Sequence, residues 1–325
     1  MGQAIIVHGG AGTIAPERFA GAREGCRAAA LAGWRVLERG GSALDAVEAA
    51  IVELENNPGF NAGTGAVLTA DGRAQLDAGM MDGRTLDVGA IAGVERIKNP
   101  IRLARRVLAS PHVLLVGAGA EQFAVEDGLA LCDPAELVTP AQRARWERGY
   151  RDGDDVNVDS ADPAASAQGA PSLAGAALSG MPDPEMDDEH KHGTVGAVAL
   201  DAAGRIVAAA STGGIAAKHP GRVGDTPLAG CGYYAEEGLG GVSSTGHGED
   251  FIRLLLAKRA VDHLGAGRSA QTAASQAIAL LGRRTGGTGG LIVLDMAGRV
   301  GVARNTSAMA FAFMAEGMSA PTAGV

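Results

Sequence analysis

An acidic, low-complexity stretch in the middle of the chain constrains the fold more than any other feature. From Gly153 to His192 the sequence is rich in Asp, Ala, Ser, Pro and Gly. Between Arg151 and Gly193, ten acidic residues stand against two basic ones, a local charge of 2 − 10 = −8 in a chain whose net charge is −9. Such a segment has little apolar surface to bury, and its charges repel one another. We predict a flexible acidic linker, about residues 153–193, that interrupts a folded domain.

Short apolar runs and helix caps alternate before the linker. Ala4–Val7 is typical of a short buried strand, and the Gly-rich segment His8–Gly12 should end it. Ser42, followed three residues later by Asp45, predicts the capped start of a helix. The other elements expected in this half are helices at Gly21–Arg39, Leu44–Glu55 and Asn99–Leu108, a hairpin of Ala66–Thr69 with the residues from Ala74 onward, and a strand at Asp87–Val94.

The half after the linker repeats this alternation. Thr194–Leu200 and Arg205–Ala210 flank a turn and predict a hairpin whose strands are apolar on both faces, as in a sheet that is covered on each side. Further elements are expected as helices at Glu249–His263 and Ser269–Leu281 and strands at Leu291–Asp295, Val300–Ala303 and Ala308–Met314. Because neither half can cover its own sheet, we predict one α/β (α+β) domain over residues 1–325, built as a four-layer αββα sandwich.

Composition excludes several classes of protein. Outside the linker the charges nearly cancel and form no basic stripe, so a nucleic-acid partner is not expected. The sequence has neither an apolar run of about 18 residues nor a signal-peptide pattern, so we expect no membrane span and no classical secretion. Cys26, Cys132 and Cys231 lie far apart without a C-x-x-C spacing. They indicate no disulfide framework and no thiolate zinc site, and they suit a reducing cytoplasm.

The junction at the end of the linker points to chemistry. Gly193 is followed by Thr194, which opens a buried strand. Threonine is a weak nucleophile, but a cut between these two residues would create an α-amine a few bonds from Oγ, with a pKa of about 7.7 to 8.0, that can act as its base. On spacing alone, the favoured interpretation of Thr194 is an ordinary β-branched strand residue.

Seven segments in a fixed order resemble a known family, the N-terminal-nucleophile hydrolases of the plant-type asparaginase group, also called isoaspartyl peptidases. Each motif is weak singly, and the seven in register over nearly the whole chain are specific. They are His8–Gly12, Asn61–Gly65, Leu76–Ala78 with Met81–Gly83, His192–Ala199, Ser211–Gly214, Pro220–Asp225 and Ser244–Glu249.

The resemblance implies a self-cleaving enzyme. Members of this family are made as inactive precursors that cut themselves at the Gly-Thr bond. Gly193 and Thr194 would form the cleavage site, giving an α subunit of residues 1–193 and a β subunit of residues 194–325 that associate as an (αβ)2 heterotetramer. Thr194 would also be the catalytic nucleophile.

Other catalytic roles follow from the same resemblance. Thr212 would hydrogen-bond the Thr194 hydroxyl or amine, although it could instead only cap the turn at Gly213 and Gly214. Thr245 and the N–H of Gly246 would form the oxyanion hole, with a helix cap as the alternative for Thr245. Asn61 would orient the nucleophile.

Substrate and metal sites are implied in the same way. Arg222 would bind the α-carboxylate of an aspartyl substrate and Asp225 its α-amino group, with Gly246 and Gly248 lining the pocket. On spacing alone, Arg222 and Asp225 could form a surface ion pair. The resemblance further implies a structural sodium ion held by main-chain carbonyls, where the alternative is an ordinary loop; the ligands would come from Leu54, Glu55, Asn57, Phe60, Ala62 and Thr64.

The expected function is therefore hydrolysis of β-aspartyl (isoaspartyl) dipeptides and L-asparagine to release L-aspartate, without an organic cofactor. One alternative is an amidase of the glycosylasparaginase type. Another is a non-enzymatic nucleotide-binding module that uses Val116–Gly119, although that glycine pattern is incomplete because Gln122 stands at its third position.

Overall fold

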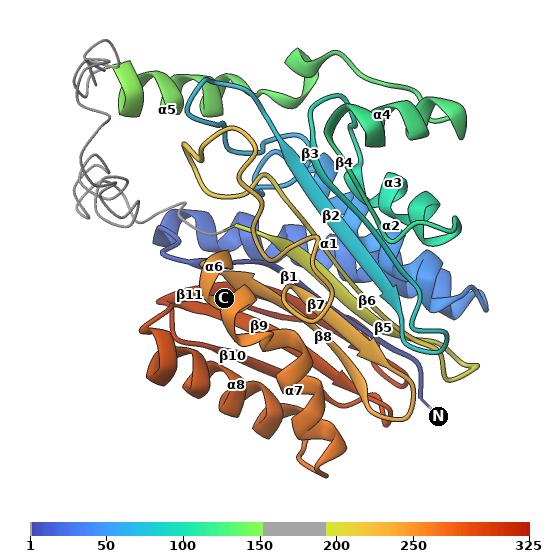
Figure 1. Ribbon diagram of the computed structural model, residues 1–325. Coiled ribbons are helices and arrows are strands. Elements are labelled where there is room, and N and C mark those ends of the chain that lie inside the picture. Colours follow the sequence, from blue (N-terminus) through green and yellow to red (C-terminus); the bar gives the residue numbers. More distant parts are fainter. Residues whose placement is uncertain (1, 152–192) are drawn as a thin grey trace, which may run out of the picture.

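The computed structural model describes residues 2–151 and 193–325 (Figure 1). The predicted linker, apart from Gly193, lies outside the described residues. Two sheets face one another and carry helices on their outer sides. This arrangement confirms the predicted αββα sandwich.

The larger sheet has eight strands in the order β12-β11-β1-β5-β6-β2-β3-β4, antiparallel except for β3 and β4. Every residue of β5 and β6 is buried, as expected for strands covered on both faces. The strands are β1 (Ala4–Gly12), β2 (Leu76–Asp82), β3 (Val88–Val94), β4 (Leu114–Val116), β5 (Val195–Leu200), β6 (Ile206–Thr212), β11 (Ala308–Ala315) and β12 (Thr322–Gly324).

The smaller sheet has four antiparallel strands in the order β10-β9-β8-β7. They are β7 (Tyr233–Glu236), β8 (Gly240–Gly246), β9 (Gly289–Asp295) and β10 (Val300–Arg304). Alternation along β1 explains how the sheets stack, because Ile5 and Val7 join the core under the helices while Ala4 and Ile6 join the core between the sheets.

Helices cover the outer faces. α1 (Phe19–Glu38), α2 (Ala43–Asn56) and α3 (Pro100–Leu108) pack on the larger sheet, and α7 (Leu256–Gly265) and α8 (Ala270–Thr285) pack on the smaller one. α2 begins as predicted, because Ser42 Oγ accepts the N–H of Asp45 at 3.2 Å. The remaining helices are α4 (Gly117–Glu126), α5 (Pro140–Arg151), α6 (Gly248–Leu254) and the short 3-10 turns Pro16–Arg18 and Pro134–Leu137. No helix in the described part of the chain is long and apolar enough to cross a bilayer.

Three expected elements differ from the structure. The strand Ala4–Val7 does not stop at His8–Gly12, because β1 continues through these residues with a bulge between His8 and Ala11. The expected helix Glu249–His263 is two helices, since Leu255 has a φ of 50° and ends α6.

The predicted hairpin strand at Ala66–Thr69 is also wrong. The N–H of Ala66 bonds to the carbonyl of Gly63 at 3.3 Å, and that of Val67 bonds to Asn61 Oδ1 at 2.9 Å. These donors are therefore used by the preceding loop, and β2 pairs with β3 and β6 instead.

Candidate active site

Thr194 lies directly before β5, which is one of the central strands of the larger sheet. Thr194 is only 5% exposed. Because Val195 pairs with Ser211, Thr194 lies beside Thr212 at the end of β6. A small cavity of about 10 Å³ lies against it. Six of its lining residues were expected from the sequence; the whole lining is Gly193, Thr194, Thr212, Gly214, Ile215, Arg222, Gly224, Asp225, Thr226 and Gly246.

Two threonines flank the candidate nucleophile. Thr194 Oγ1 lies 3.3 Å from Thr226 Oγ1, and Thr226 is fully buried. Thr212 Oγ1 accepts the backbone N–H of Gly214 at 2.9 Å, which is the turn cap expected as its alternative role. Thr226 was not expected from the sequence, where its only signal is its position next to Asp225 in a Gly-rich segment.

Arg222 and Asp225 come from the loop between β6 and β7. The Arg222 guanidinium donates from Nε and Nη2 to the two carboxylate oxygens of Glu249, at 2.9 and 2.6 Å. Asp225 is 3% exposed, and its Oδ2 has no hydrogen-bond partner among the described residues. Burial raises the pKa of Asp225 to about 7, against the opposing effect of Arg222. The cavity therefore holds a guanidinium and a carboxyl group that has an oxygen available to an ammonium ligand.

The end of β8 and the start of α6 hold the other expected residues. Thr245 is fully buried, and its Oγ1 accepts the N–H of Ala11 at 3.3 Å. Gly246 lines the cavity, whereas Thr245 and Gly248 do not. A Cβ on Gly248 would lie 2.9 Å from the backbone nitrogen and Oδ1 of Asp225. Only a glycine at this position lets α6 begin so close to Asp225.

Asn61 connects the preceding loop to this cavity. Its Nδ2 donates to the carbonyl of Gly214 at 2.7 Å, and its own carbonyl accepts the N–H of Gly213 at 3.0 Å. A Cβ on Gly193 would lie 2.6 Å from the Cβ of Asn61. Asn61 therefore fixes the turn after β6 and contacts the residue before Thr194.

The loop implied to bind sodium is tightly wound and rich in carbonyl oxygens. The carbonyls of Leu54, Glu55 and Asn57 accept N–H groups from later residues of the loop at 2.9 to 3.2 Å, and each keeps a second lone pair. Gly63 has a φ of 52°, and a Cβ there would lie 2.6 Å from the carbonyl oxygen of Glu55. Oxygen donors of this kind fit a hard cation. No cluster of three His, Cys, Asp or Glu side chains that could hold a metal occurs in residues 2–151 and 193–325.

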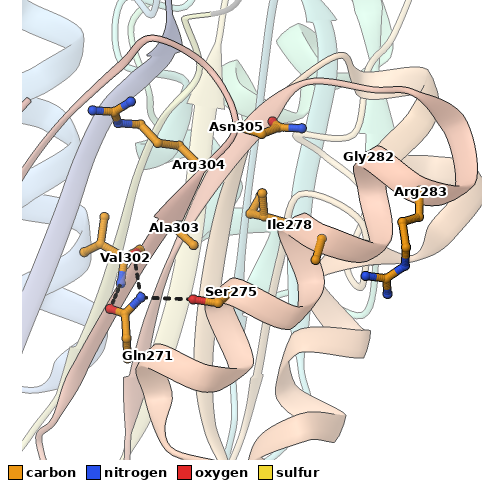
Figure 2. Close-up of a pocket in the computed structure, with 10 residues that line it drawn as sticks. Gln271, Ser275, Ile278, Gly282, Arg283, Val302, Ala303, Arg304 and Asn305 are labelled. Carbon is orange, nitrogen blue, oxygen red and sulfur yellow. Dashed lines mark hydrogen bonds between the residues drawn. The ribbon is translucent and has the colours of Figure 1, made fainter.

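Two other regions of the molecule lie away from this cavity. An open groove of about 710 Å³ is lined by residues of α8 and β10. Figure 2 shows the amide of Gln271 there, which bonds to both backbone groups of Val302. The ten residues that line the groove include Arg283 and Arg304 but pair no nucleophile with a base. Val116–Gly119, the alternative nucleotide site, lies at the β4 edge of the larger sheet.

Comparisons with known proteins agree with this geometry. The family model described as asparaginase matches residues 1–323. A plant-type L-asparaginase of Pyrococcus abyssi is 46% identical over 328 residues, covering 99% of this chain and 99% of the relative. An isoaspartyl peptidase/L-asparaginase of Bos taurus is 38% identical over 319 residues, covering 98% of this chain and 94% of the relative. The chain therefore belongs to the asparaginase family that contains the plant-type L-asparaginases and isoaspartyl peptidases.

Proposed function

We propose that this protein is a self-cleaving threonine amidohydrolase that releases L-aspartate from β-aspartyl dipeptides and from L-asparagine. The observation that carries the proposal is the single cavity that brings Thr194 together with Arg222, Asp225 and Gly246. Relatives named isoaspartyl peptidase/L-asparaginase support the same substrates.

Self-cleavage needs one nucleophile and no cofactor. Thr194 Oγ1 attacks the carbonyl carbon of Gly193, the C–N bond breaks, and the nitrogen of Thr194 takes up the proton lost by the hydroxyl. Water then hydrolyses the resulting ester, which leaves a carboxylate on Gly193 and a free amine on Thr194. The Thr226 hydroxyl, 3.3 Å from Thr194 Oγ1, is placed to hold the attacking oxygen by a hydrogen bond.

Turnover would reuse this oxygen. The free amine of Thr194 takes the Oγ1 proton as the oxygen attacks the substrate's β-carbonyl carbon, and it returns a proton to the leaving nitrogen, which leaves a β-aspartyl ester on Oγ1. Water, deprotonated by the same amine, then hydrolyses this ester, which releases L-aspartate and restores the Thr194 hydroxyl. Arg222 would bind the substrate α-carboxylate, Asp225 its ammonium group, and Thr245 with the Gly246 N–H the oxyanion. The cavity of the uncut chain, about 10 Å³, holds about one water. Departure of the residues before Thr194 would therefore make room for substrate.

Several properties of the mature enzyme belong to the same proposal. The carbonyls of Leu54, Glu55, Asn57, Phe60, Ala62 and Thr64 would hold a structural sodium ion that takes no part in the reaction. Two α and two β fragments would assemble, and exposed apolar side chains of β4 and α4, such as Val116 and Val125, offer a surface for association. The three free cysteine thiols are compatible with a protein that acts in a reducing cytoplasm.

Replacing Thr194 tests the proposal. Thr194→Ala removes the nucleophile of both reactions, so it should remain one uncut chain that folds and releases no aspartate. Thr194→Ser keeps the oxygen and should still cut, more slowly, because serine lacks the methyl group that restricts χ1. Denaturing gels over time and an aspartate-release assay measure both. A Thr194→Ala protein that still yields two fragments and aspartate would overturn the mechanism.

A further inference from the structure

Arg222 is held by the carboxylate of Glu249, a residue whose role was not expected from the sequence. The carboxylate of Glu249, near the start of α6, accepts two hydrogen bonds from Arg222, one from Nε at 2.9 Å and one from Nη2 at 2.6 Å. The Arg222 side chain is 14% exposed and that of Glu249 is 38% exposed. Arg222 lines the cavity of Thr194, whereas Glu249 does not. Glu249 therefore contacts the guanidinium from outside the cavity.

Both sides of this contact are fixed. A Cβ on Gly224 would lie 2.9 Å from Nη1 of Arg222, so the guanidinium packs against the backbone of its own loop. His247 Nε2 lies 3.3 Å from Glu249 Oε2, and His247 Nδ1 lies 2.9 Å from Asp250 Oδ2. The Glu249 carboxylate therefore contacts His247 at the start of α6 and Arg222 at the same time.

The electrostatics favour a permanent contact. Although partial burial raises the pKa of Glu249, the hydrogen bond and charge of Arg222 outweigh this and lower it to about 2. Glu249 stays ionised at physiological pH. The edge of the guanidinium that carries Nε is occupied, and the donors of Nη1 remain for another carboxylate.

We propose that Glu249 is a positioning residue that orients Arg222 so that its remaining N–H groups face the substrate carboxylate. This inference rests on the proposed function. It assigns to Glu249 a role in substrate affinity for aspartyl compounds and none in self-cleavage, because cleavage at Gly193 uses no substrate carboxylate.

The chain offers a matched control for the test. Arg84 and Glu237 form the same two-point contact at 2.9 and 3.1 Å, with both side chains more than a third exposed and outside the cavity. Glu249→Gln and Glu237→Gln each remove one carboxylate charge with little change in size. Fraction cleaved, thermal midpoint, and kcat and KM for a β-aspartyl dipeptide are measured for each variant.

We expect Glu249→Gln to cleave fully and to raise KM about tenfold with kcat within about twofold, while Glu237→Gln leaves both constants unchanged. Combined with Arg222→Lys, Glu249→Gln should add little further loss, since both changes remove one oriented guanidinium. Should Glu249→Gln not fold, Glu249→Asp keeps the charge one methylene further away, and it should raise KM less.

The measurements distinguish a failure of the role proposed for Glu249 from a failure of the proposed function. If Arg222→Lys raises KM but Glu249→Gln does not, the inference is wrong and the pocket assignment stands. A lower KM in Glu249→Gln would mean that Glu249 competes with substrate, which also overturns the inference. If Arg222→Lys itself leaves KM unchanged, the pocket assignment fails and the inference fails with it.

Discussion

At the scale of single residues, the chemistry depends on what surrounds the Thr194 hydroxyl. In the uncut chain Thr194 has no free amine, so the amine that serves turnover cannot assist self-cleavage. The hydroxyl of Thr226 lies 3.3 Å away, and Thr226 is fully buried. A hydrogen bond between Thr194 Oγ1 and this group restricts the rotation of the attacking oxygen.

Removing the Thr226 hydroxyl should therefore slow self-cleavage. Thr226→Val keeps nearly the same volume and loses the hydrogen bond, which we expect to slow cleavage about tenfold, corresponding to the roughly 1 to 2 kcal/mol of one buried hydrogen bond. Thr226→Ser should restore most of the rate. The measurement is the fraction of cut chain over time on denaturing gels, with the thermal midpoint of each variant as a control for folding. Equal rates for Thr226→Val and the parent would remove Thr226 from the mechanism.

Sequence reasoning could find Thr194 but not Thr226 or Glu249. Thr194 stands at an abrupt change from an acidic linker to a buried strand, which is visible in the chain itself. The partners of Thr226 and Glu249 lie 32 and 27 residues away in sequence, on segments whose meeting depends on the path of a loop. Side-chain contacts of this kind carry no periodic pattern.

At the scale of elements, the loop that follows α2, residues 57–65, fixes the turn after β6 through hydrogen bonds of Asn61. A Cβ on Gly63 would lie 2.6 Å from the carbonyl oxygen of Glu55 and 3.0 Å from that of Lys98, and Asn61 bonds to Gly213 and Gly214 beside Thr212. Carbonyl oxygens are the ligands that a hard cation prefers. A sodium ion in this loop would therefore hold Asn61, and through it the backbone next to Thr194.

Exchange of sodium for a large organic cation such as tetramethylammonium tests this coupling. The thermal midpoint and the rate of self-cleavage should fall together, because the same loop supports both, and sodium added back should restore them. Sodium content measured by atomic emission before and after exchange is the control. If the sodium-free protein kept its full rate and midpoint, the loop would not depend on the ion.

Most elements were predictable because their signals are local. Ser42 and Asp45 mark the start of α2, and the apolar runs of β5 and β6 flank a turn that closes within four residues. The exceptions have non-local causes. Val67 gives its N–H to Asn61 rather than to a strand, and Leu255 adopts a left-handed conformation inside a sequence that is otherwise helical.

At the scale of the whole molecule, the order of strands interleaves the two expected fragments. Residues 2–151 contain β1 to β4, and residues 194–325 contain β5 to β12. In the larger sheet β1 lies between β11 and β5, and β2 pairs with β6. This order was not predictable from sequence, because pairings such as His8 with Phe311 join opposite ends of the chain.

After self-cleavage the two fragments should therefore remain together as one folded unit. Three strand pairs and the core between the sheets join the fragments, so separating them exposes buried backbone groups and apolar side chains such as Ile6 and Ile292. With an affinity tag on the N-terminal fragment, the C-terminal fragment should stay on the resin through native washes and elute only in denaturant. The uncut Thr194→Ala chain with the same tag is the control, because its C-terminal part is covalently joined to the tag. Any of this chain that denaturant removes from the resin measures release that is not due to separation of the fragments. Recovery of the C-terminal fragment in the native wash would contradict the interleaved sheet, because a strand held on both sides cannot leave without unfolding the sheet around it.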